Sequence, residues 1–239
     1  MDPRPESGLT RRSMIAGTAA AAGLTLAGGL PGESALAAPP SEANRVKATT
    51  VKTYSNADFY DQSGTFQAEK AKQAYSDMFR RFGYSLSEPV QKGMWILEFG
   101  LGDFAHVGMA GIFWLNRQDY GYFGHEIYLL PGQMIPEHSH WATDKGPAKM
   151  ESWHVRHGMI HTFGEGDLTP EVLLKVPASQ RDLIKSRHGK PLLLDEVADL
   201  NRREAWHFMV AGPEGALVTE YGTFHDAAGL RFSNPKAKL

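Results

Sequence analysis

The sequence contains no cysteine among its 239 residues. This absence excludes disulfide bonds, thiolate-held zinc and cysteine-ligated iron–sulfur clusters. Folding is therefore indifferent to whether the surrounding compartment is oxidising. Any metal ion must be bound by nitrogen and oxygen ligands.

The chain also lacks an excess of charge of either sign, with 25 Lys and Arg against 27 Asp and Glu. Because no basic stripe is present, there is no electrostatic basis for binding nucleic acid. A P-loop, a dinucleotide-binding glycine fingerprint, a G-x-S-x-G elbow and an internal repeat are likewise missing. Hydrophobic residues make up 42% of the chain, which is enough for the core of one globular domain.

No hydrophobic run is long enough to be a convincing membrane span. The Ala- and Gly-rich stretch from Met14 to about Leu30 is short and only weakly hydrophobic. The twin arginine Arg11-Arg12 precedes it, and Ala35-Leu36-Ala37 supplies an A-x-A cleavage site. We therefore predict that residues 1–37 are a twin-arginine export signal. The protein would then be periplasmic or extracellular, without membrane contact once the signal is cleaved.

Residues 38–60 are rich in Pro, Ala and Thr without periodicity and are predicted to be a flexible lead-in. Residues 61–239 are expected to form a single domain. Within it, apolar residues recur at spacings of three and four over residues 63–82, and Gly83 follows them. This pattern predicts a helix that ends at a glycine cap and packs on the outside of the domain.

Beyond Pro89 the chain has the pattern of short strands separated by Gly and Pro turns, with few helices between them. Such a pattern predicts an all-β sandwich or barrel. Gly158, inside one of these strands, indicates a bulge, and the polar residues 168–189 indicate a surface excursion. The strands are expected at residues 94–99, 107–115, 122–130, 151–163, 192–200, 205–211 and 216–223.

Two residue pairs predict a metal site. His138 and His140 are two residues apart, as are Lys149 and Glu151, and a loop-like stretch lies between the pairs. Alternate residues of a strand point to the same face, so two strands joined by this loop can bring all four side chains together. Imidazoles and a carboxylate suit a divalent first-row metal, beside which a lysine can act as an acid or an electrostatic anchor.

A further histidine and carboxylate follow near the C-terminus. His207 lies in an apolar stretch just before the turn Gly212–Gly215, which predicts a hairpin. The register of that hairpin places His207 opposite Glu220. Glu220 lies among apolar residues, where an unpaired carboxylate is costly, so a functional use is favoured over an exposed edge strand. His125 and His225 are expected nearer the mouth of the barrel and are not predicted as ligands.

These residues resemble a known family, the D-lyxose isomerases of the cupin superfamily, from about Ala74 to the C-terminus. A histidine pair with a later Glu and His is general to cupins, whereas the Lys two residues before that Glu and the V-T-E strand are more specific to these sugar isomerases. The matching motifs are Phe99-Gly100-Leu101-Gly102, Leu130-Pro131-Gly132-Gln133, Pro136-Glu137-His138-Ser139-His140, Lys149-Met150-Glu151, Trp206-His207-Phe208, Val218-Thr219-Glu220 and Arg231-Phe232-Ser233-Asn234-Pro235.

The resemblance implies a cupin jelly-roll β-barrel with an N-terminal helix packed outside, usually as a homodimer. It implies a divalent metal, most often Mn2+, with Fe2+, Co2+ and Zn2+ as alternatives. It also implies that Lys149 and Glu220 handle protons and that Arg231 lies near the sugar or near Glu220. The implied metal ligands are His138, His140, Glu151 and His207.

The expected function is a metal-dependent sugar isomerase acting on a monosaccharide. It would interconvert an aldose and a ketose, of the D-lyxose/D-xylulose or D-mannose/D-fructose type, through an enediolate. One alternative is another metal-dependent cupin enzyme such as an iron dioxygenase, because the same ligands can hold iron. A second is a non-catalytic exported sugar-binding cupin. Lys149 and Glu220 favour the isomerase, since neither alternative needs an acid–base pair.

Overall fold

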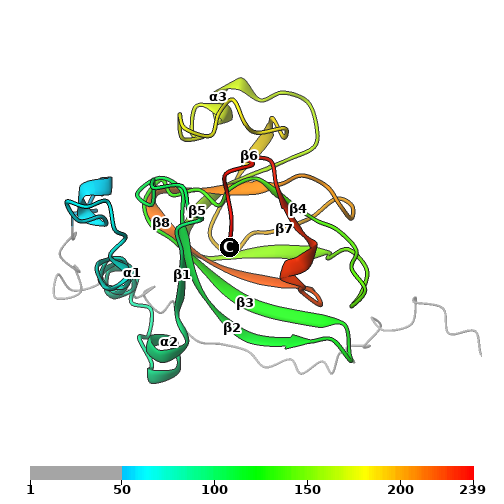
Figure 1. The fold of residues 1–239 in the computed structure, drawn as a ribbon, viewed down its shortest axis with the longest axis horizontal. Coiled ribbons are helices and arrows are strands. Elements are labelled where there is room, and N and C mark those ends of the chain that lie inside the picture. Colours follow the sequence, from blue (N-terminus) through cyan, green and yellow to red (C-terminus); the bar gives the residue numbers. More distant parts are fainter. Residues whose placement is uncertain (1–49) are drawn as a thin grey trace, which may run out of the picture. The chain divides into compact units, whose positions relative to one another are not determined.

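The computed structural model describes residues 50–239, and the predicted export signal lies outside the described residues. The described part is mostly antiparallel β-sheet, which confirms the all-β prediction. Seven strands form one sheet in the order β1-β2-β3-β8-β5-β6, with β7 beside β5, and β4 pairs with β9 in a second sheet (Figure 1). The strands are β1 (Trp95–Leu97), β2 (Met109–Arg117), β3 (Tyr122–Leu129), β4 (His138–His140), β5 (Glu151–Gly164), β6 (His188–Leu192), β7 (Val197–Asp199), β8 (Phe208–Thr223) and β9 (Leu230–Phe232).

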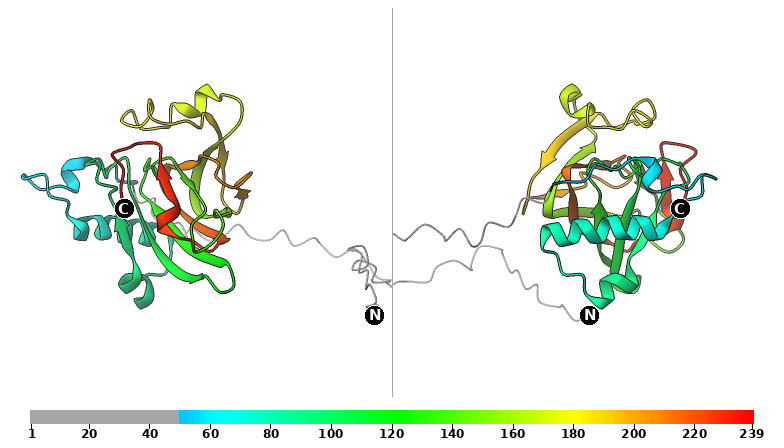
Figure 2. Two further views of the ribbon diagram at one scale, coloured as in Figure 1. Left: turned by 45° about the vertical axis from the view of Figure 1, so that its right-hand side comes forward. Right: turned by 90° about the vertical axis from the view of Figure 1, so that its left-hand side faces the viewer.

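Helix α1 (Ala68–Phe82) lies across the outer face of the sheet, as predicted (Figure 2). Its apolar residues, among them Tyr75 and Phe79, are buried against Tyr128 of the sheet. The helix ends at Gly83, whose φ of 68° is the left-handed conformation expected of a glycine cap. It begins five residues later than the sequence pattern indicated, because the Asp61 side chain accepts the backbone N–H groups of Ser63 and Thr65 and holds a turn there. Two shorter helices follow, α2 (Glu88–Gly93) and α3 (Pro170–Leu173).

The packed part of the chain begins earlier than the expected boundary at residue 61. Phe59 is buried, with its ring 4.9 Å from that of Phe104. The Asn56 side chain donates to Asp103 and accepts the backbone N–H of Ala105. Residues 56–60, the end of the predicted flexible lead-in, are therefore ordered, because burying the Phe59 ring in the core stabilises them.

Alternate side chains of each strand point to the inner and outer faces of the sheet. In β3, Phe123, His125 and Ile127 point inward, whereas Tyr128 packs against α1 on the outside. His125 pairs across β3 and β8 with Glu220, and Glu220 pairs across β8 and β5 with Trp153. One row of inward side chains across three strands therefore carries a histidine and a carboxylate inside the barrel.

The predicted hairpin around Gly212–Gly215 is wrong. Residues 208–211 and 216–223 do not pair with each other, because both pair with the long strand β5 and form one strand, β8. The four residues between them bulge opposite Met159, where the register shifts by Gly158. Gly158 (φ 70°) and Gly215 (φ 82°) supply the left-handed backbone that this irregularity requires, and a Cβ on Gly158 would lie 2.0 Å from the Gly215 carbonyl oxygen. The bulge predicted at Gly158 is therefore confirmed.

The excursion after β5 has a small core of its own at one end of the barrel, at the top of Figure 1. Val172, Val176 and Ile184 are buried against Phe163 and Phe208, whose rings stack with centroids 4.3 Å apart. The strand predicted at residues 192–200 is instead two strands, β6 and β7, because the chain turns between them. Asp195 has a φ of 65° at this turn. Within residues 50–239, no helix is both long enough and apolar enough to span a bilayer.

Candidate metal centre and active-site cavity

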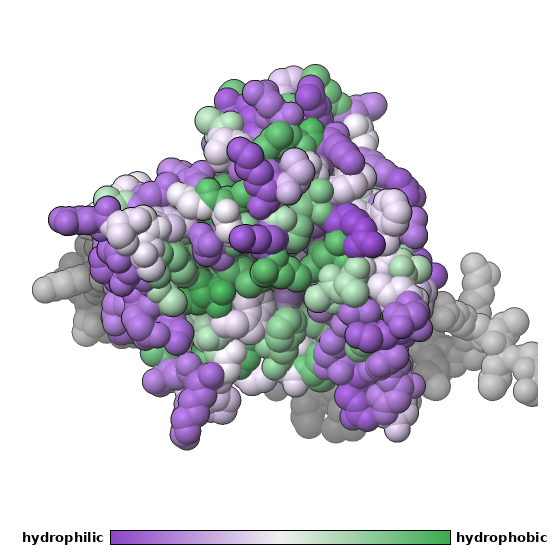
Figure 3. All heavy atoms as spheres, viewed as in Figure 1, coloured by the Kyte–Doolittle hydropathy of each residue, from purple (hydrophilic) through white to green (hydrophobic). Residues whose placement is uncertain are grey.

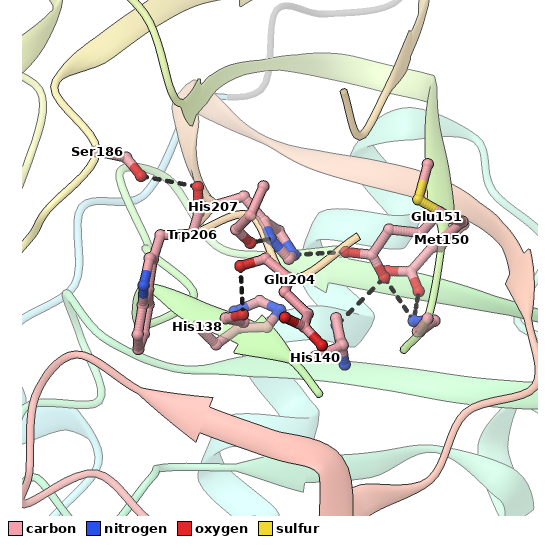
Figure 4. Close-up of polar contacts among 12 residues, drawn as sticks. His138, His140, Met150, Glu151, Ser186, Glu204, Trp206 and His207 are labelled. Atoms are coloured by element: carbon pink, nitrogen blue, oxygen red, sulfur yellow. Dashed lines mark hydrogen bonds and ion pairs between the residues drawn. The ribbon is translucent and has the colours of Figure 1, made fainter. Parts of the chain in front are cut away.

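The four predicted ligands meet inside the barrel. One ligand atom from each of His138, His140, Glu151 and His207 lies within 4.8 Å of the others (Figure 4). Strand β4 supplies the first two side chains and the start of β5 supplies the carboxylate. His207 reaches the same point because its backbone pairs with that of His138, with an N···O distance of 3.0 Å in each direction. This pairing, and not the predicted hairpin, brings His207 to the site.

Backbone carbonyls orient two of the imidazoles. The Nδ1 atom of His138 lies 2.9 Å from the carbonyl oxygen of Pro136, and that of His207 lies 2.9 Å from the carbonyl oxygen of Ala205. A carbonyl can only accept, so each Nδ1 carries the proton and donates it. The lone pair of each ring is then on Nε2, which is the tautomer that a metal-binding histidine requires.

Most of the polar atoms at this point have no hydrogen-bond partner, which fits a metal ion. The buried atoms His140 Nε2, His207 Nε2 and Glu151 Oε1 have none among the described residues, and Glu151 Oε2 contacts Lys149 Nζ at 2.6 Å. Glu151 Oε1 lies 2.5 Å from His207 Nε2, and Oε2 lies 3.4 Å from His140 Nε2. Unpaired buried polar groups are costly. A divalent cation bound by three imidazoles and one carboxylate would satisfy all of them.

The electrostatics of His138 and Glu151 are compatible with this role, whereas at His207 burial lowers the pKa but the neighbouring Glu151 outweighs it and raises the pKa. Burial lowers the pKa of His138 well below its usual value, and the neighbouring His207 and His140 lower it further. Burial opposes ionisation of Glu151, but Lys149, His140 and His207 together hold its pKa well below the usual value. A neutral imidazole and an ionised carboxylate are the forms that bind metal.

Lys149 and Glu220 form a buried ion pair beside the ligands. Lys149 Nζ contacts Glu220 Oε1 and lies 2.6 Å from Glu151 Oε2. Burial disfavours the charged lysine, yet Glu151 and Glu220 outweigh it and raise its pKa. Burial and the nearby Glu151 raise the pKa of Glu220, but Lys149 and His125 outweigh them and lower it. Glu220 is therefore ionised inside the barrel, next to the candidate metal.

His125 is a site residue that the sequence analysis placed only at the mouth. Its Nε2 lies 3.2 Å from Glu220 Oε2, so Glu220 is held by Lys149 on one oxygen and by His125 on the other. The alternation Phe123, His125, Ile127 in an apolar strand could have signalled an inward-facing histidine. The predicted hairpin pairs Glu220 with His207, so it hides the pairing of Glu220 on β8 with His125 on β3.

Arg231 is not brought to the site. In the β4–β9 ladder it pairs with Ser139, whereas His138 pairs with Phe232 and His140 with Leu230. Arg231 therefore projects from the opposite face of this ladder. It is exposed, donates to the carbonyl oxygens of Ala228 and Leu230, and lies over the Trp141 ring at 5.6 Å. The expectation that Arg231 contacts the sugar or Glu220 is therefore corrected.

A cavity of about 300 Å³ opens onto this cluster. Its polar lining consists of His138, His140 and Glu151, together with Lys149, Glu220, His125 and His225. Burial, followed by the positive charge of Lys149, lowers the pKa of His225 to about 3, so this ring is neutral near pH 7. The remaining lining is apolar and consists of Trp95, Leu97, Phe99, Met109, Phe113, Phe123, Ile127, Ile135, Ala227, Leu230, Phe232 and Leu239.

Comparison with known proteins finds relatives among sugar isomerases. The sequence is 29% identical over 170 residues to a D-lyxose ketol-isomerase of Cohnella laeviribosi, covering 71% of this chain and 91% of that protein. It is 25% identical over 162 residues to a D-lyxose/D-mannose isomerase of Thermosediminibacter oceani, covering 68% of this chain and 88% of that protein. No protein-family model matches the sequence.

Solved structures share the fold at lower sequence identity. An L-ribose isomerase of Acinetobacter sp. DL28 superposes with a TM-score of 0.58 at 14% identity, covering 76% of this chain and 95% of that one. An L-ribose isomerase of Cellulomonas parahominis gives a TM-score of 0.57 at 16% identity, covering 75% and 95%. At such identity the superposition demonstrates a common fold. In sequence the chain is similar to D-lyxose ketol-isomerases, and it shares its fold with the L-ribose isomerases.

Proposed function

We propose that this protein is a metal-dependent isomerase that interconverts an aldose and a ketose. The observation that carries the proposal is an ionised carboxylate, Glu220, buried beside a candidate metal centre and held by Lys149 and His125. The curated relatives are named for D-lyxose and D-mannose, which makes these two sugars our proposed substrates.

The residues of the chain divide the chemistry between them. His138, His140, Glu151 and His207 would hold the metal. When bound, the metal would supply a Lewis acid that polarises the carbonyl and stabilises negative charge on the substrate oxygens. Glu220 takes the proton from C2 of the aldose and returns it to C1. Lys149 donates a proton to the O1 oxygen as charge develops there and takes the proton that leaves O2, so that the carbonyl moves from C1 to C2 and the lysine is restored.

The closest rival chemistry is oxygen activation by an iron cupin. Nothing in that chemistry requires a buried carboxylate held between a lysine and a histidine, and the same applies to a protein that only binds sugar. Maintaining two buried carboxylates around one lysine is costly unless they are used. The arrangement therefore favours the isomerase over both alternatives.

Manganese is our proposal for the metal, because a nitrogen and oxygen ligand set accepts it and no thiolate is present. Metal analysis of the protein as isolated, followed by reconstitution with Mn2+, Fe2+, Co2+ or Zn2+, would identify the active ion. Activity restored by iron with oxygen consumption, and not by manganese, would favour the dioxygenase.

We also propose that the protein is exported, on the strength of Arg11-Arg12 and the A-x-A sequence that ends at Ala37. Cell fractionation of the wild type and of a variant with Arg11 and Arg12 replaced by lysine tests this proposal. Retention of the variant in the cytoplasm supports it, and equal distribution of both proteins contradicts it.

A homodimer is proposed from the outer face of the sheet. Leu115 and Tyr221 flank Gly124 across three strands, and both are exposed, as is Tyr122. An exposed cluster of large apolar side chains on a sheet is typical of an interface. Light scattering of the purified protein decides the oligomeric state, and Tyr221→Glu should dissociate a dimer that uses this face.

The decisive test of the function is a conversion assay on the metal-loaded protein. We expect aldose–ketose conversion of D-lyxose or D-mannose, abolished in Glu220→Gln with the metal content unchanged. Glu126→Gln is the matched control, because Glu126 lies on the neighbouring strand β3 but accepts hydrogen bonds from Tyr84 and Tyr128, outside the barrel. Undiminished turnover in Glu220→Gln would remove Glu220 from the mechanism, and no conversion of any aldose by metal-loaded wild type would contradict the isomerase.

A further inference from the structure

The polar side chains of the sheet that line the cavity fall into two adjacent rows. The first row joins Phe123 of β3 and Glu151 of β5 through Gly222 of β8. The second row joins His125, Glu220 and Trp153. Lys149 reaches the same rows, since its Nζ lies over the Phe123 ring at 4.4 Å and contacts Glu220. The residues proposed to bind the metal and move protons therefore lie in or next to these two rows, at one end of the cavity.

Further along the strands the inner face becomes apolar. In the next row, Trp95 of β1 pairs with Gly111, Gly111 with Ile127, and Ile127 with Val218. The backbone groups of these strands pair with one another in the sheet, so they offer few free donors or acceptors to a ligand. The apolar walls of the cavity are formed by this row and by core residues near it. They are Trp95, Leu97, Phe99, Met109, Ile127, Ile135 and Phe232.

One face of the molecule has an apolar centre. Apolar residues gather at the centre of the face in Figure 3, which is viewed like the barrel of Figure 1, and hydrophilic residues surround them. Most of the residues that form the apolar walls also belong to, or pack on, the main hydrophobic core. The part of the cavity beyond the two polar rows is therefore an extension of the core, without a charged side chain among its lining residues.

The polar groups at this end can serve only part of a sugar. Lys149 and Glu220 are committed to the oxygens and the proton at C1 and C2. His125 Nδ1 and His225 Nδ1 are buried without hydrogen-bond partners and can accept or donate one hydrogen bond each. Trp95 Nε1 is also buried without a partner and can donate one. A hydroxyl that reaches past Trp95 to Leu97 and Met109 would meet carbon atoms, and burying it there without a partner is unfavourable.

We propose that the substrate is a deoxy aldose, in which the terminal carbon is a methyl group instead of a hydroxymethyl group. This inference rests on the proposed isomerase function and specifies its substrate class. The hydroxyls at C1 to C3 face the polar rows, and the terminal methyl group packs against Leu97, Met109 and Ile127. A site lined by carbon favours a methyl group over a hydroxymethyl group, because the methyl group gains from leaving water and carries no hydroxyl to leave unpaired.

Two matched sugar pairs test the proposal on the full chain loaded with Mn2+. These are D-lyxose against 5-deoxy-D-lyxose and D-mannose against 6-deoxy-D-mannose, each pair differing by one oxygen atom. We expect kcat/KM to be roughly tenfold to a hundredfold higher for the deoxy sugar of each pair. Calorimetric titration of the same sugars gives a second readout that does not depend on turnover. Equal or better use of the parent sugars overturns the substrate class while the isomerase function stands.

A variant of the apolar wall separates this proposal from a general effect on activity. Leu97→Gln places a hydrogen-bonding group on the wall at a half-buried position of β1, and it should lower the preference for the deoxy sugar about tenfold. Leu174→Gln, at an exposed position directly after α3, is the control and should leave the preference unchanged. Met109→Gln is the second wall variant if Leu97→Gln does not fold.

The outcomes distinguish the two proposals. If no sugar is converted but the deoxy sugars bind more tightly than their parents, the isomerase function fails and the assignment of the apolar wall stands. If a preference for the deoxy sugar is present in wild type and unchanged in both wall variants, the apolar wall is not its cause and the inference is overturned.

Discussion

At the scale of single residues, the state of Glu220 is set by its two contacts. Lys149 and His125 lower the pKa of this carboxyl against the opposing effects of burial and of Glu151. His125 is itself packed between the rings of Phe113 and Phe123, at centroid distances of 5.4 and 4.7 Å. Its ring is therefore fixed where it can hold Glu220, and we infer that it positions the base.

His125→Phe tests this role because it keeps the aromatic packing and removes the nitrogen atoms. Loss of the contact between His125 and the ionised Glu220 should lower kcat about tenfold, with KM and metal content little changed. The pKa of Glu220 should rise, so the acidic limb of the pH–rate profile should move to higher pH. His154→Phe, on the outer face of β5, is the control. An unchanged pH profile in His125→Phe would show that His125 does not act on Glu220.

At the scale of elements, one buried carboxylate connects the metal-binding strand to the excursion after β5. Glu137 directly precedes β4 and is 1% exposed. Its two oxygens accept the backbone N–H groups of Lys185 and Ser186, at 2.7 and 2.6 Å. Ser186 Oγ in turn donates to the carbonyl oxygen of Trp206, next to His207 (Figure 4). The excursion thereby braces both segments that carry imidazole ligands.

Glu137→Gln should destabilise the protein by about 1.5–3 kcal/mol, because a carboxylate that accepts two buried N–H groups is replaced by an amide with one acceptor oxygen. Urea denaturation measures this change. Glu171→Gln, at an exposed position in α3, is the control and should change stability by less than about 0.5 kcal/mol. A loss no larger than that of the control would contradict the bracing role of Glu137.

Sequence patterns predicted where helices and strands lie in the chain better than they predicted which strands pair. The periodicity of α1 and the glycine after it follow from local preferences, so this helix was predictable. The pairing of β8 was not, because Gly212 to Gly215 has the composition of a hairpin turn whether its arms pair with each other or with a third strand. Strand β5 is long enough to pair with both arms of β8, from Glu151 to Phe163, so the arms pair with β5 and not with each other.

At the scale of the whole molecule, Asp103 joins three segments that are distant in the sequence. Its carboxylate accepts hydrogen bonds from Asn56 near the start of the described chain and from Ser179 in the excursion, each at 2.8 Å, and it lies 2.6 Å from His106. Burial disfavours its charge, but these three partners outweigh burial and lower the pKa.

A carboxyl whose pKa is lowered by folding contributes stability that is present above its unfolded pKa, about 3.9, and is lost as the pH falls through the lower folded value. Asp103→Asn should therefore destabilise the protein by about 1 kcal/mol near pH 7. The difference between wild type and variant should shrink below about pH 4. Urea denaturation of both proteins at several pH values measures it, and a difference independent of pH would mean that ionised Asp103 is not the cause.

The sequence by itself determined the all-β class, the outer helix and the grouping of His138 and His140 with Glu151, while the family resemblance added His207 as a fourth candidate ligand. The features read from the sequence follow from spacing, since the period of a strand or helix decides locally which side chains share a face. The tertiary structure alone decided that His125 holds Glu220, that Arg231 lies outside the site and that the far wall of the cavity is apolar. Those features depend on which strands pair and in which register, and contacts between residues far apart in the chain set that register.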